Sequence, residues 1–490
     1  MDFNMILYSS DVEFYTKKDG ILLENQINKL SEYVKVQEMQ SGRPMHASVR
    51  TFGCQMNAHD SEKLEDMLLR MGYTLTTEEK QADLVLINTC CVRENAENKL
   101  YGHLGAFKNI KRENPDMKLV VCGCMTQQGA VAEKLTRTYK HVDIIFGTFN
   151  LHRFPDMLLT HLESGSQLID IWEEPDNTDL PAPEHRHFSM KASVNIVYGC
   201  DNFCSFCIVP YVRGRERSRH PDDILKEILQ QAKCGASEVM LLGQNVNSYG
   251  KSGIYLGNQT SPDKPVYFSD LLNKTCEIDD IKRIRFMTSH PKDISEDLIK
   301  TMRDQPKICK HLHLPVQSGS SRILNLMNRQ YTKESFLELV KRLKEQIPNI
   351  ALSTDIIVGF PGETEEDFED TLDLVEQVRF SGAFTFIYSK RPGTAAASLE
   401  SNASESEIKS RFNRLLSVLN PIILEENQKQ IGKVLHVLAE NVNENDPSLL
   451  TGRTDCNRVV HFSADESSVS KFVSVKITGC KTFYLTGEKT

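Results

Sequence analysis

Three cysteines, Cys200, Cys204 and Cys207, have the spacing in this chain that points most directly to chemistry; they are called the loop cysteines below. Thiolates suit iron–sulfur clusters and zinc alike, but a closed structural zinc site needs four ligands, usually as two paired halves. No matching second pair stands nearby. Three cysteines on a 4Fe-4S cube leave one iron without a protein ligand, which is the open position that substrate chelation needs. The spacing predicts such a cluster, and a zinc loop or three unrelated thiols is the alternative.

A second set, Cys54, Cys90 and Cys124, has no linear motif, but its members end three successive predicted strands in TFGC, INTC and VCGC. Open α/β sheets bind ligands outside the carboxyl ends of their strands, so these sheet-edge cysteines are expected to meet and to hold a second cluster. Free cysteine is also a common small buried hydrophobic residue. On that ground Cys91 and Cys122 are interpreted as ordinary strand or turn residues.

The elements that position the sheet-edge cysteines belong to an alternating series that begins near residue 46. Helix-like segments near 58–71, 94–112 and 127–140 separate short apolar runs that read ASVRTF, ADLVLIN, KLVVC and VDIIF. This alternation is typical of parallel strands joined by helices, and it predicts an N-terminal doubly wound α/β domain over 45–163. Residues 1–44 show neither sustained alternation nor a clear helical stripe, and they are interpreted as an extension of unassigned role.

A Pro- and acid-rich stretch within 164–185 has the composition of a linker. The next part, 186–418, contains a second alternating series with the strands VNIVY, EVMLL, RIRFM, HLHLPV, ALSTDIIVG and AFTFIY. Six strand and helix units predict a partial (βα)6 barrel, whose working residues lie on loops at the carboxyl ends of strands, where the loop cysteines stand. Short β-rich pieces separated by turn residues predict a small antiparallel β-barrel over 421–486.

The composition is ordinary for a soluble globular protein, with 40% hydrophobic and 26% charged residues. No apolar stretch approaches the roughly 20 residues that span a bilayer, and the start does not resemble a secretory signal, so we expect a cytoplasmic protein without a membrane partner. An odd number of cysteines, 13, favours metal ligation over disulfides. The net charge of -9 gives no global argument for nucleic-acid binding.

The loop motif CxxxCxxC, with Phe206 before its last cysteine, is similar to that of the radical S-adenosylmethionine superfamily. The resemblance implies that the open iron chelates the amino and carboxylate groups of S-adenosylmethionine, which an electron from the cluster cleaves to a 5'-deoxyadenosyl radical. Each candidate cofactor contact alone could be a turn former or helix cap, but the set surrounds one barrel mouth. The candidates are Phe206, Gly243, Gln244, Asn245, Ser289, Gln317, Ser318, Asp355 and Gly359.

From about residue 46 to its end the chain resembles the methylthiotransferases, and most closely the tRNA 2-methylthio-N6-dimethylallyladenosine synthases. The matching motifs are TFGCQMN, NTCCVRENAENK, PYVRGRERSR, LLGQNVNSY, HLHLPVQSGSSRIL, DIIVGFPGET and YSKRPGT. The resemblance identifies the last part as a TRAM domain and implies that the sheet-edge cysteines hold an auxiliary 4Fe-4S cluster, the source of the inserted sulfur. Ala395 departs from the pattern, because proline is expected after RPGT.

The resemblance also implies the reaction and its partners. One S-adenosylmethionine would methylate a sulfur of the auxiliary cluster, and a second would give the radical that abstracts hydrogen from carbon 2 of an isopentenylated adenosine beside the tRNA anticodon. The two clusters would perform the chemistry, rather than a protein acid or base. The implied partners are this tRNA, an electron donor such as flavodoxin or ferredoxin, and a sulfur or cluster carrier.

Four arginines alternate just beyond the loop cysteines, at Arg213, Arg215, Arg217 and Arg219. Guanidinium groups suit phosphate contacts, so we expect these side chains to bind RNA. The alternative is a strand face that forms ion pairs with Glu216 and other acids of the domain. Two other functions also stay open: methylthiotransfer to threonylcarbamoyladenosine or to a ribosomal protein side chain, and a non-catalytic RNA-binding iron–sulfur sensor.

Overall fold

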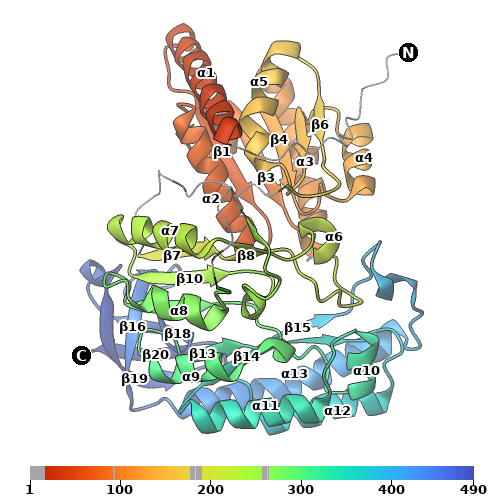
Figure 1. Ribbon diagram of the computed structural model, residues 1–490, viewed down its shortest axis with the longest axis vertical. Helices are drawn as coiled ribbons and strands as arrows, with labels where there is room; N and C mark the ends of the chain where they lie inside the picture. The colour runs from red at the N-terminus through yellow and green to blue at the C-terminus, as the bar shows by residue number, and fades with distance from the viewer. Residues whose placement is uncertain (1–16, 92–93, 177–182, 184–189, 257–261, 263) are drawn as a thin grey trace.

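The structure is a computed structural model that describes residues 17–91, 94–176, 183, 190–256, 262 and 264–490. Figure 1 shows three parts in chain order: an N-terminal α/β unit, a central unit with parallel strands and a C-terminal β-barrel beside the central unit. This arrangement confirms the predicted α/β architecture with a terminal barrel. Among the described residues, no helix is both long enough and apolar enough to cross a membrane.

The N-terminal unit is built on a parallel sheet of six strands in the order β2-β1-β3-β4-β5-β6. Alternate residues of β3 point into two different cores: Leu84 and Leu86 pack toward α1, α2 and α5, whereas Val85 and Ile87 pack toward α3 and α4. Helices therefore cover both faces, which confirms the doubly wound prediction. The elements are β1 (His46–Thr51), β2 (Thr74–Leu75), β3 (Leu84–Thr89), β4 (Lys118–Gly123), β5 (Ile144–Phe146), β6 (Leu168–Asp170), α1 (Lys17–Ser41), α2 (Gln55–Arg70), α3 (Glu94–Glu113), α4 (Gly129–Thr138) and α5 (Phe154–Ser164).

Helix α1 corrects the interpretation of residues 1–44. Leu23, Ile27, Leu30 and Val34 are buried against the N-terminal sheet, and their spacing of four, three and four residues is a helical stripe. The stripe is narrow and lies among polar residues, which is why it did not stand out in the sequence. Residues 1–16 lie outside the described residues.

Strand β6 extends the N-terminal unit beyond the predicted boundary at residue 163. It pairs in parallel with β5 at Ile144↔Leu168 and Ile145↔Ile169, within the range that was assigned to the linker. The short strand is half-buried at the edge of the sheet, so it lacks the apolar run that marks the central strands. Most of the Pro- and acid-rich stretch, 177–182 and 184–185, lies outside the described residues.

Six parallel strands form the central unit as two neighbouring sheets, β7-β10-β12 and β13-β14-β15. Ile284 of β12 pairs with the segment that leads into β13, because its N–H donates to the Lys307 carbonyl at 2.8 Å and its carbonyl accepts from the Cys309 N–H at 3.0 Å. The partial barrel is therefore confirmed. The strands are β7 (Lys191–Asn195), β10 (Glu238–Leu242), β12 (Arg283–Phe286), β13 (His311–His313), β14 (Ala351–Val358) and β15 (Gly382–Ile387).

Helices on the outside of the partial barrel bury its largest hydrophobic core. In Figure 1 they follow the strands in alternation, with α11, α12 and α13 side by side below β13, β14 and β15. The helices are α7 (Pro221–Lys233), α8 (Phe268–Cys276), α9 (Glu296–Asp304), α11 (Lys333–Gln346), α12 (Glu365–Val378) and α13 (Glu405–Gln428).

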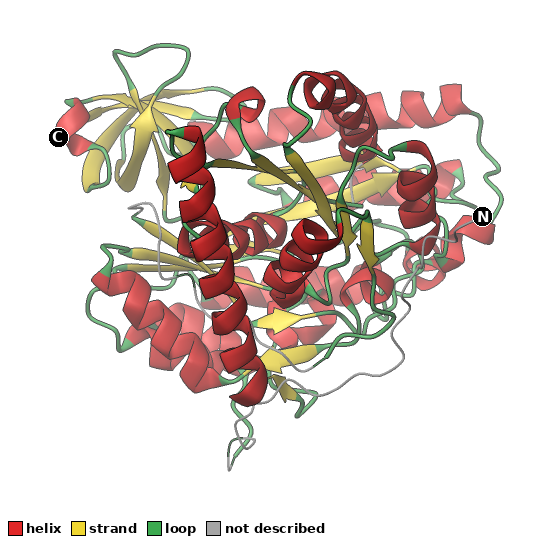
Figure 2. Cartoon of the chain, turned by 90° about the horizontal axis from the view of Figure 1, so that it is seen from above, coloured by secondary structure: helices red, strands yellow, loops and turns green. Residues whose placement is uncertain are grey.

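The C-terminal unit is a closed barrel in the order β16-β17-β18-β20-β19, visible at the upper left of Figure 2. The expectation of a wholly antiparallel barrel is corrected at one pair, because β18 and β20 run in parallel. Helix α13 leads into the barrel and runs across the predicted boundary near residues 418–421. The strands are β16 (Val434–Val442), β17 (Leu450–Thr454), β18 (Val459–Ser463), β19 (Phe472–Cys480) and β20 (Leu485–Lys489).

Two arginines of β12 attach the C-terminal barrel to the central unit. Arg283 donates to the carbonyl oxygens of Arg453 and His436, both at 3.0 Å. Arg285 donates to the carbonyl oxygen of Asp455 at 3.0 Å. Both arginine side chains are buried, so these bonds are shielded from solvent.

Candidate functional site

The loop cysteines lie on the segment that leaves β8 (Val197–Tyr198) and enters the short helix α6 (Val209–Arg213). Gly199 opens the loop at φ +71°, and a Cβ at this position would lie 2.1 Å from the Arg215 carbonyl oxygen, so glycine is required. On the other side, Asn328 Nδ2 donates to the Phe203 carbonyl oxygen at 3.0 Å. The loop is therefore held from two sides by distant parts of the central unit.

Two of the loop cysteines, Cys200 and Cys207, are half-buried in surroundings that disfavour their free thiolates. Burial raises the pKa of Cys200 to about 11 and the pKa of Cys207 to about 12, and the neighbouring Cys204 thiol adds to both shifts. Arg329 Nη1 donates to Cys204 Sγ at 3.3 Å, and its guanidinium also donates to the Pro315 carbonyl oxygen at 2.7 Å. A bound metal deprotonates thiols that would otherwise stay neutral, so these thiols fit metal ligation.

Within the described residues, no three or more His, Cys, Asp or Glu side chains converge on a position for a metal ion. The fit of an iron–sulfur cluster and its cofactor depends instead on donor type, burial and unsatisfied polar atoms. Ser289 Oγ and His290 Nε2, just beyond β12, are buried without a hydrogen-bond partner. Burial lowers the pKa of His290, so its ring is neutral. Buried polar atoms are costly when unpaired, and a polar ligand at this barrel mouth would satisfy them.

Several of the predicted cofactor contacts are hydrogen-bonded to other parts of the protein. Asn245 Nδ2 donates to Asp293 Oδ2 at 2.7 Å. Ser318 Oγ accepts from a backbone N–H of its own turn at 3.2 Å, and the Gly359 N–H donates to Glu363 Oε2 at 3.0 Å. These contacts shape the loops at the barrel mouth.

The remaining predicted contacts lie in varied surroundings. Phe206 is half-buried beside an apolar cluster, Gln317 is buried at φ +71°, and Asp355 lies 3.4 Å from the His313 ring. Gly243 is packed so closely that a Cβ would lie 2.3 Å from Val197 Cγ1. Gln244 Nε2 lies 2.8 Å from Met56 Sδ of the N-terminal unit, so it contacts the other half of the site.

The structure brings the sheet-edge cysteines together at the carboxyl ends of β3 and β4 and before α2. The thiols of Cys54 and Cys90 are hydrogen-bonded, and this bond lowers the pKa of Cys54 to about 6, against the effect of burial. Asn57 Oδ1 lies 3.8 Å from Cys54 Sγ and 3.6 Å from Cys124 Sγ. A Cβ on Gly53, at φ +124°, would lie 2.2 Å from Cys90 Cβ, so glycine permits this close approach.

Cys91 is a fourth thiol of this group, contrary to its interpretation as an ordinary turn residue. Its hydrogen bond with Cys124 raises the pKa of Cys91 and lowers that of Cys124. Cys91 and Cys124 also pack with Ile208 and Val212, which directly follow the loop cysteines. The sheet-edge group therefore packs against the segment of the central unit that follows the loop cysteines. Cys122, by contrast, is buried in the core of the sheet as expected.

Arg213 crosses from the central unit into the group of sheet-edge cysteines. Its guanidinium lies 2.7 Å from Asp60 Oδ2, donates to Asn57 Oδ1 at 2.8 Å and donates to Cys124 Sγ at 3.2 Å. The arginine is 4% exposed. The expectation that Arg213 binds RNA is therefore corrected, because its hydrogen-bonding groups face the protein interior.

The other alternating arginines differ in exposure. Arg219 is corrected in the same way, because it is buried and lies 2.6 Å from Glu227. Arg217 is half-buried and donates to the Asp176 carbonyl oxygen at 2.6 Å. Arg215 is exposed, pairs with Asp201 at 2.7 Å, and stays the best placed of the four for a phosphate contact.

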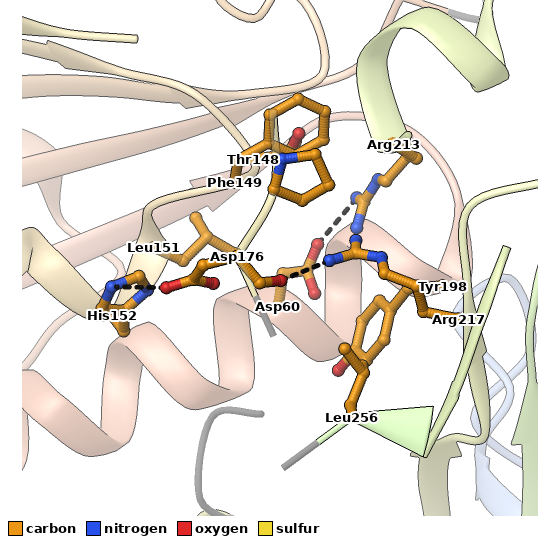
Figure 3. A pocket seen from close by; sticks show the side chains of 11 residues that line it. Asp60, Thr148, Phe149, Leu151, His152, Asp176, Tyr198, Arg213, Arg217 and Leu256 are labelled. Atoms are coloured by element: carbon orange, nitrogen blue, oxygen red, sulfur yellow. Dashed lines mark hydrogen bonds and ion pairs between the residues drawn. The ribbon is translucent and has the colours of Figure 1, made fainter. Parts of the chain in front are cut away.

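A small cavity of about 50 Å³ lies between the N-terminal and central units, next to Arg213. Figure 3 shows Arg213 and Asp60 on one side of it and His152 beside Asp176 on another, with His152 Nε2 and Asp176 Oδ2 at 3.6 Å. The charged side chains that line this small cavity suit ordered water.

Sequence reasoning missed the polar residues that touch the thiols or pair with the arginine beside them. Asn57 and Asp60 lie three and six residues after Cys54, so their place on α2 was available from the sequence as a helix face. Arg329 lies 125 residues after Cys204 and gave no local signal.

Three family models match the chain. The Radical SAM superfamily matches residues 194–375, the Uncharacterized protein family UPF0004 matches residues 46–147, and the TRAM domain matches residues 428–490.

Similar sequences extend over nearly the whole chain. A tRNA-2-methylthio-N(6)-dimethylallyladenosine synthase of Alkaliphilus oremlandii is 49% identical over 469 residues, covering 96% of this chain and 98% of the relative. A protein with the same name from Acetivibrio thermocellus is 52% identical over 461 residues, covering 94% of both chains.

Among solved structures, the radical S-adenosylmethionine methyltransferase TsrM from Kitasatospora setae, with cobalamin and a 4Fe-4S cluster bound, is similar with a TM-score of 0.53. The match covers 72% of this chain and 77% of TsrM at 14% sequence identity. A second TsrM structure, with tryptophan substrate and a SAM analogue, gives a TM-score of 0.54. At this identity the likeness shows the fold alone.

Proposed function

The chain belongs to the family of tRNA-2-methylthio-N(6)-dimethylallyladenosine synthases, and from this premise we propose that it methylthiolates carbon 2 of N6-dimethylallyladenosine beside the tRNA anticodon. It is a radical S-adenosylmethionine tRNA methylthiotransferase. The observation that best supports neighbouring clusters is the packing of Cys91 and Cys124 against Ile208 and Val212, which follow the loop cysteines in the chain. Radical generation and sulfur donation would then take place at neighbouring sites.

Three thiols on each side fit the two cofactors. A reduced 4Fe-4S cluster on the loop cysteines, when bound, supplies the electron that cleaves S-adenosylmethionine, and we assign a second cluster, the sulfur source, to the sheet-edge cysteines. One S-adenosylmethionine would serve as methyl donor and a second as radical source.

The protein's part is to position these groups and to exclude water. Arg329 fixes Cys204, and Asn57 lies between Cys54 and Cys124. The adenine of an anticodon loop is stacked, so the reacting base must be extruded to enter between the two cysteine sets. The TRAM domain, attached through Arg283 and Arg285, supports tRNA as the partner.

The reaction needs electrons and sulfur that the chain does not store. We therefore include among its partners a low-potential electron donor such as flavodoxin or ferredoxin, and a sulfur or cluster carrier. A tRNA substrate supports the cytoplasm as the place of action.

The assay is anaerobic reconstitution of the full chain with iron, sulfide, reductant, S-adenosylmethionine and isopentenylated tRNA, followed by mass spectrometry of the nucleosides. We expect the 2-methylthio-N6-dimethylallyl nucleoside. For substitutions of the loop or sheet-edge cysteines in this assay, Cys234→Ala is the matched control, because Cys234 is exposed and belongs to neither cysteine set. Full cluster loading without any methylthio nucleoside would contradict the proposal and leave the RNA-binding sensor. Product on threonylcarbamoyladenosine tRNA or on a ribosomal protein instead would show the other methylthiotransferase activity.

A further inference from the structure

Arg213 is the point at which the central unit reaches into the sheet-edge cysteines. It is the last residue of α6 and lies six residues after Cys207, yet its guanidinium contacts Asn57, Asp60 and Cys124 of the N-terminal unit. The segment around it is also anchored to that unit, because Thr148 Oγ1 donates to the Val212 carbonyl oxygen at 2.5 Å. The N-terminal unit therefore does not complete this group of side chains by itself.

The contacts of Arg213 differ from those of an ordinary ion pair. The Asp60 carboxylate lies at 2.7 Å and balances one charge, but a separate donor, Nε, faces Cys124 Sγ at 3.2 Å. Hydrogen bonds from a cation to a sulfur anion are strong, and burial at 4% exposure removes the water that would screen them. A thiolate ligand at Cys124 would thus have a fixed positive charge beside it.

The loop cysteines have a counterpart of this arrangement. Buried Arg329 donates to Cys204 Sγ at 3.3 Å. Each cysteine set thus has one buried guanidinium on one of its sulfurs, supplied by a segment distant from that cysteine in the sequence.

We propose that Arg213 is a positioning residue for the auxiliary cluster. Its guanidinium donates a hydrogen bond to the Cys124 ligand, and its positive charge stabilises the reduced form of the cluster. The inference rests on the proposed function, because it requires a cluster on the sheet-edge cysteines. It follows that the auxiliary site is complete only when the central unit is docked. Net charge and hydrogen bonds to sulfur are the factors that set cluster potentials, and loss of such an outer contact weakens metal binding about 10–100-fold.

The test uses the full chain with all three loop cysteines changed to alanine, so that only the auxiliary cluster contributes to the spectra. Four versions are compared: the background itself, Arg213→Gln, Arg213→Lys and Arg215→Gln. Arg215→Gln is the matched control, because this neighbouring arginine is exposed and pairs with Asp201. The readouts are iron and sulfide content, the midpoint potential from a redox titration followed by electron paramagnetic resonance, and the rate of iron loss to a chelator.

We expect Arg213→Gln to shift the midpoint potential downward and to accelerate iron loss about 10-fold or more. Arg213→Lys keeps the charge and should restore most of the potential, and Arg215→Gln should match the background. An unchanged potential and unchanged iron loss in a folded Arg213→Gln protein would overturn the inference.

Asp60→Asn separates an electrostatic role from a structural one. It breaks the same ion pair but leaves the cation, so the potential should rise rather than fall. Downward shifts of equal size in Asp60→Asn and Arg213→Gln would show that the pair only holds the units together, and would overturn the inference. The background reports on the proposed function separately: if it binds no cluster with Arg213 intact, the auxiliary-cluster assignment fails, and with it the premise.

Discussion

The buried ion pair between Arg219 and Glu227 allows a quantitative test of the structural role of Arg219. The two charged groups lie 2.6 Å apart, and their side chains are 3% and 1% exposed. Glu227→Gln removes the carboxylate charge and leaves the guanidinium in the interior, which costs about 3–5 kcal/mol in such pairs. We expect the free energy of unfolding to fall by that amount.

The assay is guanidinium chloride unfolding of the full chain, with the transition midpoint compared among variants under identical conditions. The control is Asp304→Asn, which breaks a pair of similar length, 2.7 Å, whose side chains are 43% and 50% exposed. Asp304→Asn should change the free energy of unfolding far less than Glu227→Gln does, because water screens the exposed charges. The double change Arg219→Met with Glu227→Leu should recover most of the loss, since apolar replacement of a buried pair is often neutral.

Two results would refute this reasoning. One is a cost for Glu227→Gln no greater than that of the control. The other is weaker tRNA binding by the folded double variant, because that would show Arg219 reaching RNA. The pH dependence gives a further check: burial alone would raise the pKa of Glu227, but the positive charges of Arg219, His59 and Lys63 together outweigh burial and lower the pKa below the ordinary 4.5. The stabilisation is therefore present above that pH and lost as the pH falls through the lowered pKa.

Further expectations concern the thiols and α1. Cys204→Ala should abolish 5'-deoxyadenosine formation, whereas Cys90→Ala should keep that cleavage but lose sulfur insertion; full product from Cys90→Ala in the nucleoside assay would contradict the auxiliary assignment. In metal-free protein, alkylation of Cys54 followed by peptide mass spectrometry should rise through about pH 6, since its pKa is lowered to about 6, and a rise only above pH 8 would contradict this environment. Leu30→Ala, at a fully buried position, should lower the free energy of unfolding by about 2–5 kcal/mol, measured by urea unfolding. Val36→Ala, at 48% exposure, should change it little. Equal losses of stability in the two variants would argue against the packing of α1.

The sequence allowed the three-part architecture to be predicted because strand ends and helical spacing are local signals. Cys54, Cys90 and Cys124 could be placed at one sheet edge for the same reason, since the carboxyl ends of parallel strands coincide. Arg213 and Arg219 could not be assigned, because alternation looks the same whether a guanidinium faces solvent or an acid from another element. Asp60 and Glu227, which decide the matter, lie on different helices.

Neither the fourth thiol nor the direction of β20 could be predicted. Cys91 adjoins Cys90, and only the folded turn decides whether its thiol faces the core or the group. The parallel pairing of β18 with β20 depends on how the barrel closes, and the hydrophobic alternation of each strand is the same in either direction.

The bonds from Arg283 and Arg285 end on main-chain carbonyl oxygens of the C-terminal barrel, at Arg453, His436, Thr454 and Asp455. Every residue type has this acceptor, including proline. Substitutions at the four acceptor positions therefore keep the anchoring oxygen, whereas either arginine has no equivalent replacement. The surface residues of the barrel can therefore vary among relatives while the barrel stays attached to the central unit. RNA preference can change in this way without loss of the attachment.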